Sequence, residues 1–161
     1  MPNRVMLDIE TLGLDPGASI VAIGAVRFDA DGLGDTFQRS ISLTSCENAG
    51  LTIDAETLEW WLTQDELAKD QLVGGSRLGP ALHDFAEWYE GADEIWANSP
   101  SFDCEILSAA YDAVGLDEPW KFWNERDFRT LESFDFAPDP EQAGVEHDAL
   151  DDAVHQAEIA A

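Results

Sequence analysis

Residues 19–29 of this chain form a long apolar run, and before it, over residues 3–10, apolar and polar residues alternate with a period of two. Such a period is typical of strands, because successive side chains of a strand point to opposite faces of a sheet. Turn-forming residues at 15–17 and 30–32 interrupt the pattern twice. The pattern therefore predicts an antiparallel meander of three strands, over residues 3–10, 19–29 and 35–43.

After Asp54, which is a suitable helix N-cap, the apolar residues follow the period of helices, broken by short strand-like runs. The order predicts one α/β domain over residues 1–161, a mixed five-stranded sheet flanked by helices. The predicted elements are a helix through Trp60-Trp61-Leu62, a helix marked by Leu78, Leu82, Phe85 and Tyr89, a strand at 94–97, a helix capped at Ser99-Pro100, a strand and helix start at 126–131, a loop at 135–146 and a last helix from about His147.

The composition is that of a folded protein, with 161 residues, 45% hydrophobic and 10% aromatic. No apolar stretch is long enough to span a bilayer, and the first residues do not have the pattern of a signal peptide. Two dispersed cysteines, Cys46 and Cys104, do not resemble a disulfide framework or a zinc site. We therefore expect a cytoplasmic protein without a membrane partner.

The net charge of -26 is extreme, from 34 acidic against 8 basic residues. Phosphate binding usually relies on Lys and Arg, so this charge alone argues against a nucleic-acid partner. Bound divalent metals would supply local positive charge. An acidic surface with few lysines also fits adaptation to molar salt, where the Debye length is about 3 Å. A soluble acidic protein at ordinary salt is the alternative.

Five residues far apart in the sequence are candidates for chemistry: Asp8, Glu10, Asp103, His147 and Asp152. Asp8 and Glu10 are two apart on a strand, so they share a face. Each residue alone has a structural explanation, such as a strand end or a helix terminus. Together, four carboxylates and a histidine suit two hard divalent cations and a base, the equipment for cutting phosphodiester bonds.

His147 and Asp152 are five residues apart, about 140° around a regular helix, so they do not share a helical face. We therefore expect His147 at the junction of loop and helix, with Asp152 one turn inside. Ala149, between them, permits close packing. His83 and His155 are interpreted as structural.

Three motifs resemble the DEDDh class of 3′–5′ exonucleases, which have a ribonuclease H-like fold. They are Asp8-Ile9-Glu10-Thr11-Leu12-Gly13, Asn98-Ser99-Pro100-Ser101-Phe102-Asp103 and His147-Asp148-Ala149-Leu150-Asp151-Asp152. The stretches 53–62 and 119–131 are most similar to the branch with exoribonuclease AS and phage exonucleases. Ser99-Pro100 is a departure, because that branch often has a glycine there.

The resemblance implies that Asp8, Glu10, Asp103 and Asp152 bind two Mg²⁺ or Mn²⁺ ions and that His147 is the general base. It implies single-stranded RNA or DNA 3′ ends as substrate, RNA preferred, nucleoside 5′-monophosphates as product, and a homodimer. A DNA-specific exonuclease, an inactive nucleic-acid-binding module and a plain metal-binding protein are the alternatives.

Substrate contacts are a further prediction. Tryptophans 60, 61, 120 and 123 could stack on bases, although each also suits the core. Arg126 and Arg129 could reach a phosphate or a partner subunit, or pair with the acidic surface. The residues that we assign to substrate binding are Thr11, Gly13, Trp61, Phe102 and Arg129.

Overall fold

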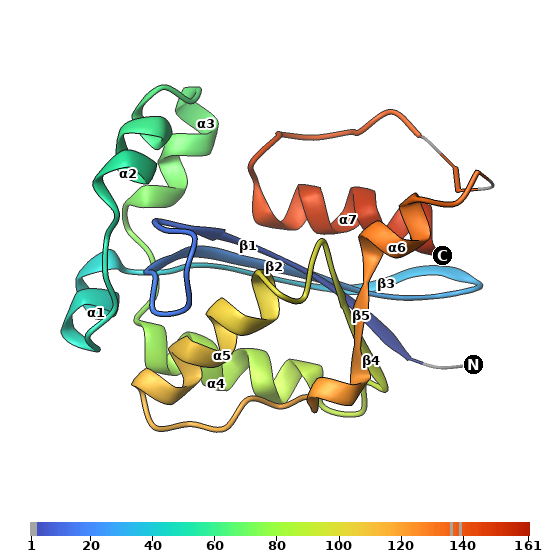
Figure 1. Cartoon of the computed structure of the whole chain (residues 1–161), viewed down its shortest axis with the longest axis horizontal. Coiled ribbons are helices and arrows are strands. Elements are labelled where there is room, and N and C mark those ends of the chain that lie inside the picture. The colour runs from blue at the N-terminus through green and yellow to red at the C-terminus, as the bar shows by residue number, and fades with distance from the viewer. Residues whose placement is uncertain (1–2, 136, 139) are drawn as a thin grey trace.

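The computed structural model describes residues 3–135, 137–138 and 140–161. A five-stranded sheet of order β3-β2-β1-β4-β5 forms its centre (Figure 1). β1 pairs antiparallel with β2 and β2 with β3, whereas β4 is parallel to β1 and β5 to β4. The predicted mixed sheet is thus confirmed. Its strands are β1 (Arg4–Thr11), β2 (Ile20–Asp29), β3 (Gly32–Ser40), β4 (Glu94–Ala97) and β5 (Glu125–Asp127).

Helices cover both faces of the sheet (Figure 1). α4 (Leu78–Tyr89) and α5 (Asp103–Ala113) lie on one face, and α6 (Phe128–Glu132) and α7 (Ala149–Ala160) on the other. No helix within the described residues is long and apolar enough to cross a membrane. The remaining elements are α1 (Leu43–Asn48), α2 (Ala55–Leu62), α3 (Glu66–Lys69) and the 3-10 turns η1 (Asp70–Leu72) and η2 (Phe122–Asn124).

The alternation in β1 separates two cores. Val5, Leu7 and Ile9 pack in the core beneath α4 and α5, whereas Met6 packs in the core beneath α7. Asp8 and Glu10 continue the Met6 face toward the end of the strand. This is the predicted period, and it directs both carboxylates to the α7 side of the sheet.

Of the two predicted helix caps, one is present in the structure and one is not. The Asp54 carboxylate accepts the Thr57 N–H at 2.8 Å and caps α2. The predicted cap at Ser99 is wrong, because its hydroxyl lies 2.7 Å from that of Ser101 and α5 begins only at Asp103. The backbone carbonyl of Ser99 instead accepts the N–H of Asp103 at 3.0 Å.

Short elements escaped prediction. α1 and α3 have six and four residues, too few for a helical period to be recognisable. The described residues within 135–146 have no helix or strand, and the rest of that predicted loop, positions 136 and 139, lies outside the described residues.

Candidate active site

Three carboxylates from opposite ends of the chain meet on the α7 side of the sheet. Carboxylate oxygens of Asp8, Glu10 and Asp152 all lie within 4.8 Å of one another. Two come from β1, and the third comes from the first turn of α7. Converging carboxylate oxygens are the ligands that Mg²⁺ and Mn²⁺ prefer, so this cluster fits a divalent cation.

The close seating of α7 on the sheet depends on Gly24. This residue pairs with Asp8 across β1 and β2. A Cβ atom at Gly24 would lie 2.2 Å from the backbone of Ala149 and Leu150, so only glycine fits there. Ala149 is fully buried, as its predicted role in close packing requires. Because Gly24 has no side chain, the start of α7 can approach β2 closely, and this places Asp152 beside Asp8.

Asp103 lies beside the cluster at the start of α5. Its side chain is 2% exposed, and its Oδ1 accepts the Ile9 N–H at 3.1 Å. The hydrogen bond ties α5 to β1 between Asp8 and Glu10. The 4.8 Å group in the described residues does not include Asp103, whose charge nevertheless helps raise the pKa of Asp8.

Burial disfavours the charged forms of these carboxylates when no cation is bound. Desolvation, then the charges of Asp103, Glu10 and Asp152, raises the pKa of Asp8 well above its usual value. Burial, then the charge of Asp152, raises the pKa of Glu10 to about 8. Burial likewise raises the pKa of Asp103 to about 7 and raises that of Asp152. Such a cluster gains from a cation that neutralises it.

His147 occupies the predicted junction, two residues before α7, with a left-handed backbone (φ 63°). Its N–H donates to Oδ2 of Asp152 at 3.2 Å, so the third motif folds back on itself. Asp148 caps α7, because its Oδ1 accepts the N–H groups of Leu150 and Asp151. The expected geometry of His147 and Asp152 is therefore present.

Several glutamine side chains also contact the site residues, and no pattern in the sequence predicts them. Gln142 donates to Oδ1 of Asp152 at 2.6 Å. Gln156, one turn after Asp152 in α7, hydrogen-bonds Asp8. Gln71 donates to the carbonyl of His147 at 2.7 Å. A glutamine in a turn or on a helix resembles any surface glutamine, so only the folded chain identifies these contacts.

A cavity of about 420 Å³ opens beside Glu10. Its wall combines apolar and acidic side chains: Ile9, Glu10, Thr11, Leu14, Asp54, Glu56, Thr57, Trp60, Trp61 and Phe102. Thr11 and Phe102 were both predicted to contact substrate. The hydroxyl of Thr11 is buried and donates to the carbonyl of Gly13 at 2.7 Å. Gly13 packs against Ala18, since a Cβ there would lie 2.9 Å from the Ala18 side chain.

Stacking of a base on Trp61 was predicted, and this is wrong for the observed structure. Trp61 is 1% exposed, and its indole N–H donates to the carbonyl of Thr11 at 2.9 Å. Trp120 is also buried, and its indole N–H donates a hydrogen bond to the Glu125 carboxylate. Trp60, 43% exposed in the cavity wall, is the tryptophan that presents its ring here.

Two arginines near β5, an edge strand of the sheet, form ion pairs with carboxylates. Arg129 pairs with Asp127 at 3.1 Å, and Arg126 pairs with Glu94 at 3.0 Å. Pairing with the acidic surface was one of the two interpretations of these residues. Arg129 does not line the cavity beside Glu10, so its contact with substrate stays a prediction.

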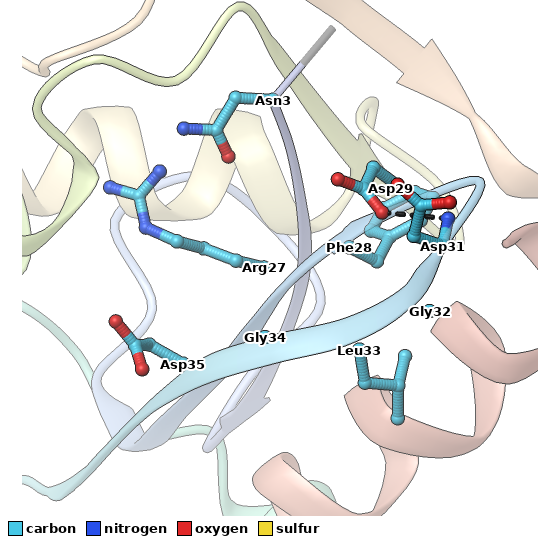
Figure 2. Close-up of a pocket in the computed structure, with 9 residues that line it drawn as sticks. All are labelled: Asn3, Arg27, Phe28, Asp29, Asp31, Gly32, Leu33, Gly34 and Asp35. Carbon is cyan, nitrogen blue, oxygen red and sulfur yellow. Dashed lines mark hydrogen bonds between the residues drawn. The ribbon is translucent and has the colours of Figure 1, made fainter. Parts of the chain in front are cut away.

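Two further cavities differ in their relation to the carboxylates. One, of about 270 Å³, is lined by His147, Asp152, Gln142 and His155, among others, and adjoins the cluster. The other, of about 350 Å³, lies at the β2–β3 hairpin (Figure 2). Its nine lining residues include none of the five candidates, and Arg27 there donates to the carbonyls of Trp88 and Glu90. The carboxylate cluster therefore lies at the end of β1 and β2 opposite to this hairpin cavity.

Comparison with known proteins relates this chain to nucleases. The model of the Rv2179c-like family, described as a 3′-5′ exoribonuclease domain, matches residues 3–161. An exodeoxyribonuclease of Enterobacteria phage T4 is 24% identical over 155 residues, which cover 78% of this chain and 68% of the phage protein. The crystal structure of cell-death related nuclease 4 (CRN-4) superposes with a TM-score of 0.58 at 14% identity, over 99% of this chain and 62% of that one.

The fold and the site thus define a ribonuclease H-like 3′–5′ exonuclease domain. The chain belongs to the Rv2179c-like 3′-5′ exoribonuclease family, which confirms the resemblance to DEDDh exonucleases. It spans less than two thirds of CRN-4, a likeness that shows the fold alone.

Proposed function

We propose that the protein is a metal-dependent exonuclease that removes nucleoside 5′-monophosphates from the 3′ end of single-stranded nucleic acid, with RNA preferred. The observation that carries this proposal is the partly buried cluster of Asp8, Glu10 and Asp152 beside an open cavity. Asp103, whose charge raises the pKa of Asp8, is the fourth carboxylate of the set. Family membership supports the exonuclease chemistry and the preference for RNA.

The four carboxylates would hold two Mg²⁺ or Mn²⁺ ions. When bound, these ions lower the pKa of the attacking water and stabilise charge on the leaving oxygen. The cavity beside Glu10 accepts the 3′-terminal nucleoside, because its apolar wall suits a base and its acidic side chains repel additional phosphates. Phe102 and the exposed ring of Trp60 supply stacking surface.

His147 accepts the proton of the attacking water. The hydrogen bond from the backbone N–H of His147 to the Asp152 carboxylate keeps His147 at the edge of the carboxylate cluster. Histidine is the side chain that most often serves as a general base in enzymes. Arg129 remains a candidate contact for the phosphate backbone, provided that substrate displaces it from Asp127.

The test uses labelled single-stranded RNA and the matching DNA with Mn²⁺ in molar salt. We expect stepwise shortening from the 3′ end in the wild type, faster for RNA, and none in Asp8→Ala. Faster shortening of DNA would favour a deoxyribonuclease, the activity in the name of the phage relative. Binding of Mn²⁺ without shortening of either strand would instead favour an inactive binding module.

We also propose a cytoplasmic homodimer adapted to high salt. Phe122 and Trp123, 77% and 62% exposed, form an edge-to-face pair that suits contact with a second copy. The net charge of -26 supports the salt adaptation. Sedimentation as a monomer at micromolar concentration would remove the dimer, and an unchanged melting temperature from low to molar salt would remove the adaptation. Cell fractionation tests the compartment.

A further inference from the structure

His147 is held by a segment that is not part of the three motifs. Residues 55–72, here called the arm, comprise α2, α3 and η1 and stand at the end of the sheet where β1 finishes (Figure 1). The arm makes two contacts with His147, one to its backbone and one to its ring. One contact comes from α2, the first element of the arm, and the other from η1, its last element.

The backbone contact comes from Gln71 in η1. Its Nε2 donates to the carbonyl of His147 at 2.7 Å and to that of Ala68 at 3.2 Å. Gln71 is 7% exposed, and its Oε1 is buried without a hydrogen-bond partner among the described residues. Burying an unpaired amide oxygen is unfavourable, so this glutamine is a poor choice for packing alone. Its donors instead fix the left-handed backbone of His147, whose φ is 63°.

The ring contact comes from Trp60 in α2. Its ring lies edge to face with the His147 imidazole, at a centroid distance of 4.9 Å and an angle of 82°. Trp60 packs in the same way on Trp61 at 5.5 Å, and Trp61 is anchored to the carbonyl of Thr11. The imidazole therefore rests on an aromatic pair that is tied to the end of β1.

We propose that Gln71 and Trp60 are positioning residues that orient His147 for its work as general base, an inference that rests on the proposed function. Gln71 fixes the backbone of His147, and Trp60 fixes the plane of its ring. Because Trp60 also lines the cavity beside Glu10, a nucleoside in that cavity touches the residue that orients the base. Filling of the cavity and orientation of His147 are thereby coupled.

The kinetic test is a double-mutant cycle between the arm and His147. We expect Gln71→Leu and Trp60→Leu each to lower kcat about 10- to 100-fold, within the range of general base catalysis. Gln71→Leu should change KM for a short RNA less than about threefold, whereas Trp60→Leu also removes a stacking surface from the cavity and should raise KM. Trp60→Phe keeps an aromatic edge and retains most of kcat. Leu67→Ala, at an exposed position of α3, leaves kcat unchanged.

In a His147→Ala background the arm substitutions should have no further effect on kcat, because there is no imidazole left to orient. An equal loss in both backgrounds would overturn the positioning role. If His147→Ala itself leaves kcat unchanged, the proposed base is wrong, and that failure is distinct from failure of the arm. Since Trp60 is 43% exposed, Trp60→Leu carries the test if Gln71→Leu does not fold.

A second readout needs no activity. The chain has three histidines, so the imidazole signals can be assigned by NMR with single substitutions of His83 and His155. We expect Trp60→Leu to shift the His147 ring protons by loss of the ring current, with His83 unchanged as the internal control. Identical His147 signals in wild type and Trp60→Leu would contradict the ring contact.

Discussion

Two clusters of possible metal ligands in this molecule look alike by distance and differ in every other respect. Asp8, Glu10 and Asp152 form one, and His83, Asp84 and Glu87 form the other, each with its ligand atoms within 4.8 Å of one another. The second cluster lies on about one turn of α4, and all three residues are exposed. The first joins β1 to α7.

Burial is what separates the two clusters. On α4, water screens the charges, and Asp84 pairs with Arg39 at 3.5 Å. At the first cluster, burial raises the pKa of each carboxylate, with Glu10 at about 8. Close ligand atoms alone therefore do not make a site. Carboxylates that lie close together and are shielded from water are stabilised by a bound cation. Exposed carboxylates at the same spacing gain less, because water already screens their charges.

The largest expected difference is in activity. Asp8→Asn should lower kcat on the order of 10³-fold, because loss of metal-assisted stabilisation amounts to several kcal/mol. Asp84→Asn, the same change in the exposed cluster, should leave kcat within about twofold, in line with ordinary surface substitutions. Single-turnover shortening of a labelled RNA measures both, and equal losses in the two variants would erase the distinction.

The second effect concerns the seating of α7. Gly24→Ala places a methyl group against the backbone of Ala149 and should lower the free energy of unfolding by about 3 kcal/mol, with loss of activity as Asp152 moves. Gly79→Ala in α4 meets nothing within 4 Å and should stabilise by about 0.5–1 kcal/mol. Chemical denaturation measures both. A neutral Gly24→Ala would mean that α7 is seated by other contacts.

The third effect is stabilisation by metal. Mn²⁺ at 100 times its Kd should stabilise the wild type by about 2.7 kcal/mol, which raises Tm by roughly 5–10 °C in a domain of this size. Glu10→Gln should lose most of the shift, and His83→Ala should keep it. Calorimetry at fixed salt measures it, and dependence of the shift on His83 would place the strong site on α4.

The smallest effect is a pH dependence of the metal-free protein. Folding raises the pKa of Glu10 to about 8 and that of Asp103 to about 7, so the folded state binds more protons than the unfolded state. The stabilisation from these groups is therefore full below about pH 4 and is lost as pH rises to about 8, so Tm should fall over this interval. Saturating Mn²⁺ should flatten this slope. A Tm that rises over the same interval without metal would contradict it.

Much of the fold was predictable because it follows from local periods. The alternation in residues 3–10 separated the apolar Val5 face from the Asp8 face, and the structure has the same division. The Asp54 cap was predictable, since it depends on one side chain and the N–H three residues later. The Ser99 cap failed because a serine hydroxyl can bind several neighbours, and this one lies against Ser101.

The tryptophans show where local pattern ends. Adjacent residues on a helix differ by about 100° in direction, so Trp60 and Trp61 point to different surroundings. The helix alone does not say which of the two rings faces inward. Contact with Thr11, fifty residues away, buries Trp61 and leaves Trp60 in the cavity wall. Gln71 and Gln142 are similar cases, because their partners His147 and Asp152 are distant in sequence.

The sequence by itself determined the periods of the strands and helices, the Asp54 cap and the three motifs, since each depends on residues within a few positions of one another. It also proposed four carboxylates for the site, of which the structure brings Asp8, Glu10 and Asp152 together. Only the tertiary structure decided that Asp8, Glu10 and Asp152 meet and that Gly24 admits α7. The physical reason is that burial and close approach depend on how distant segments pack, and such packing is not encoded in any one segment of the chain.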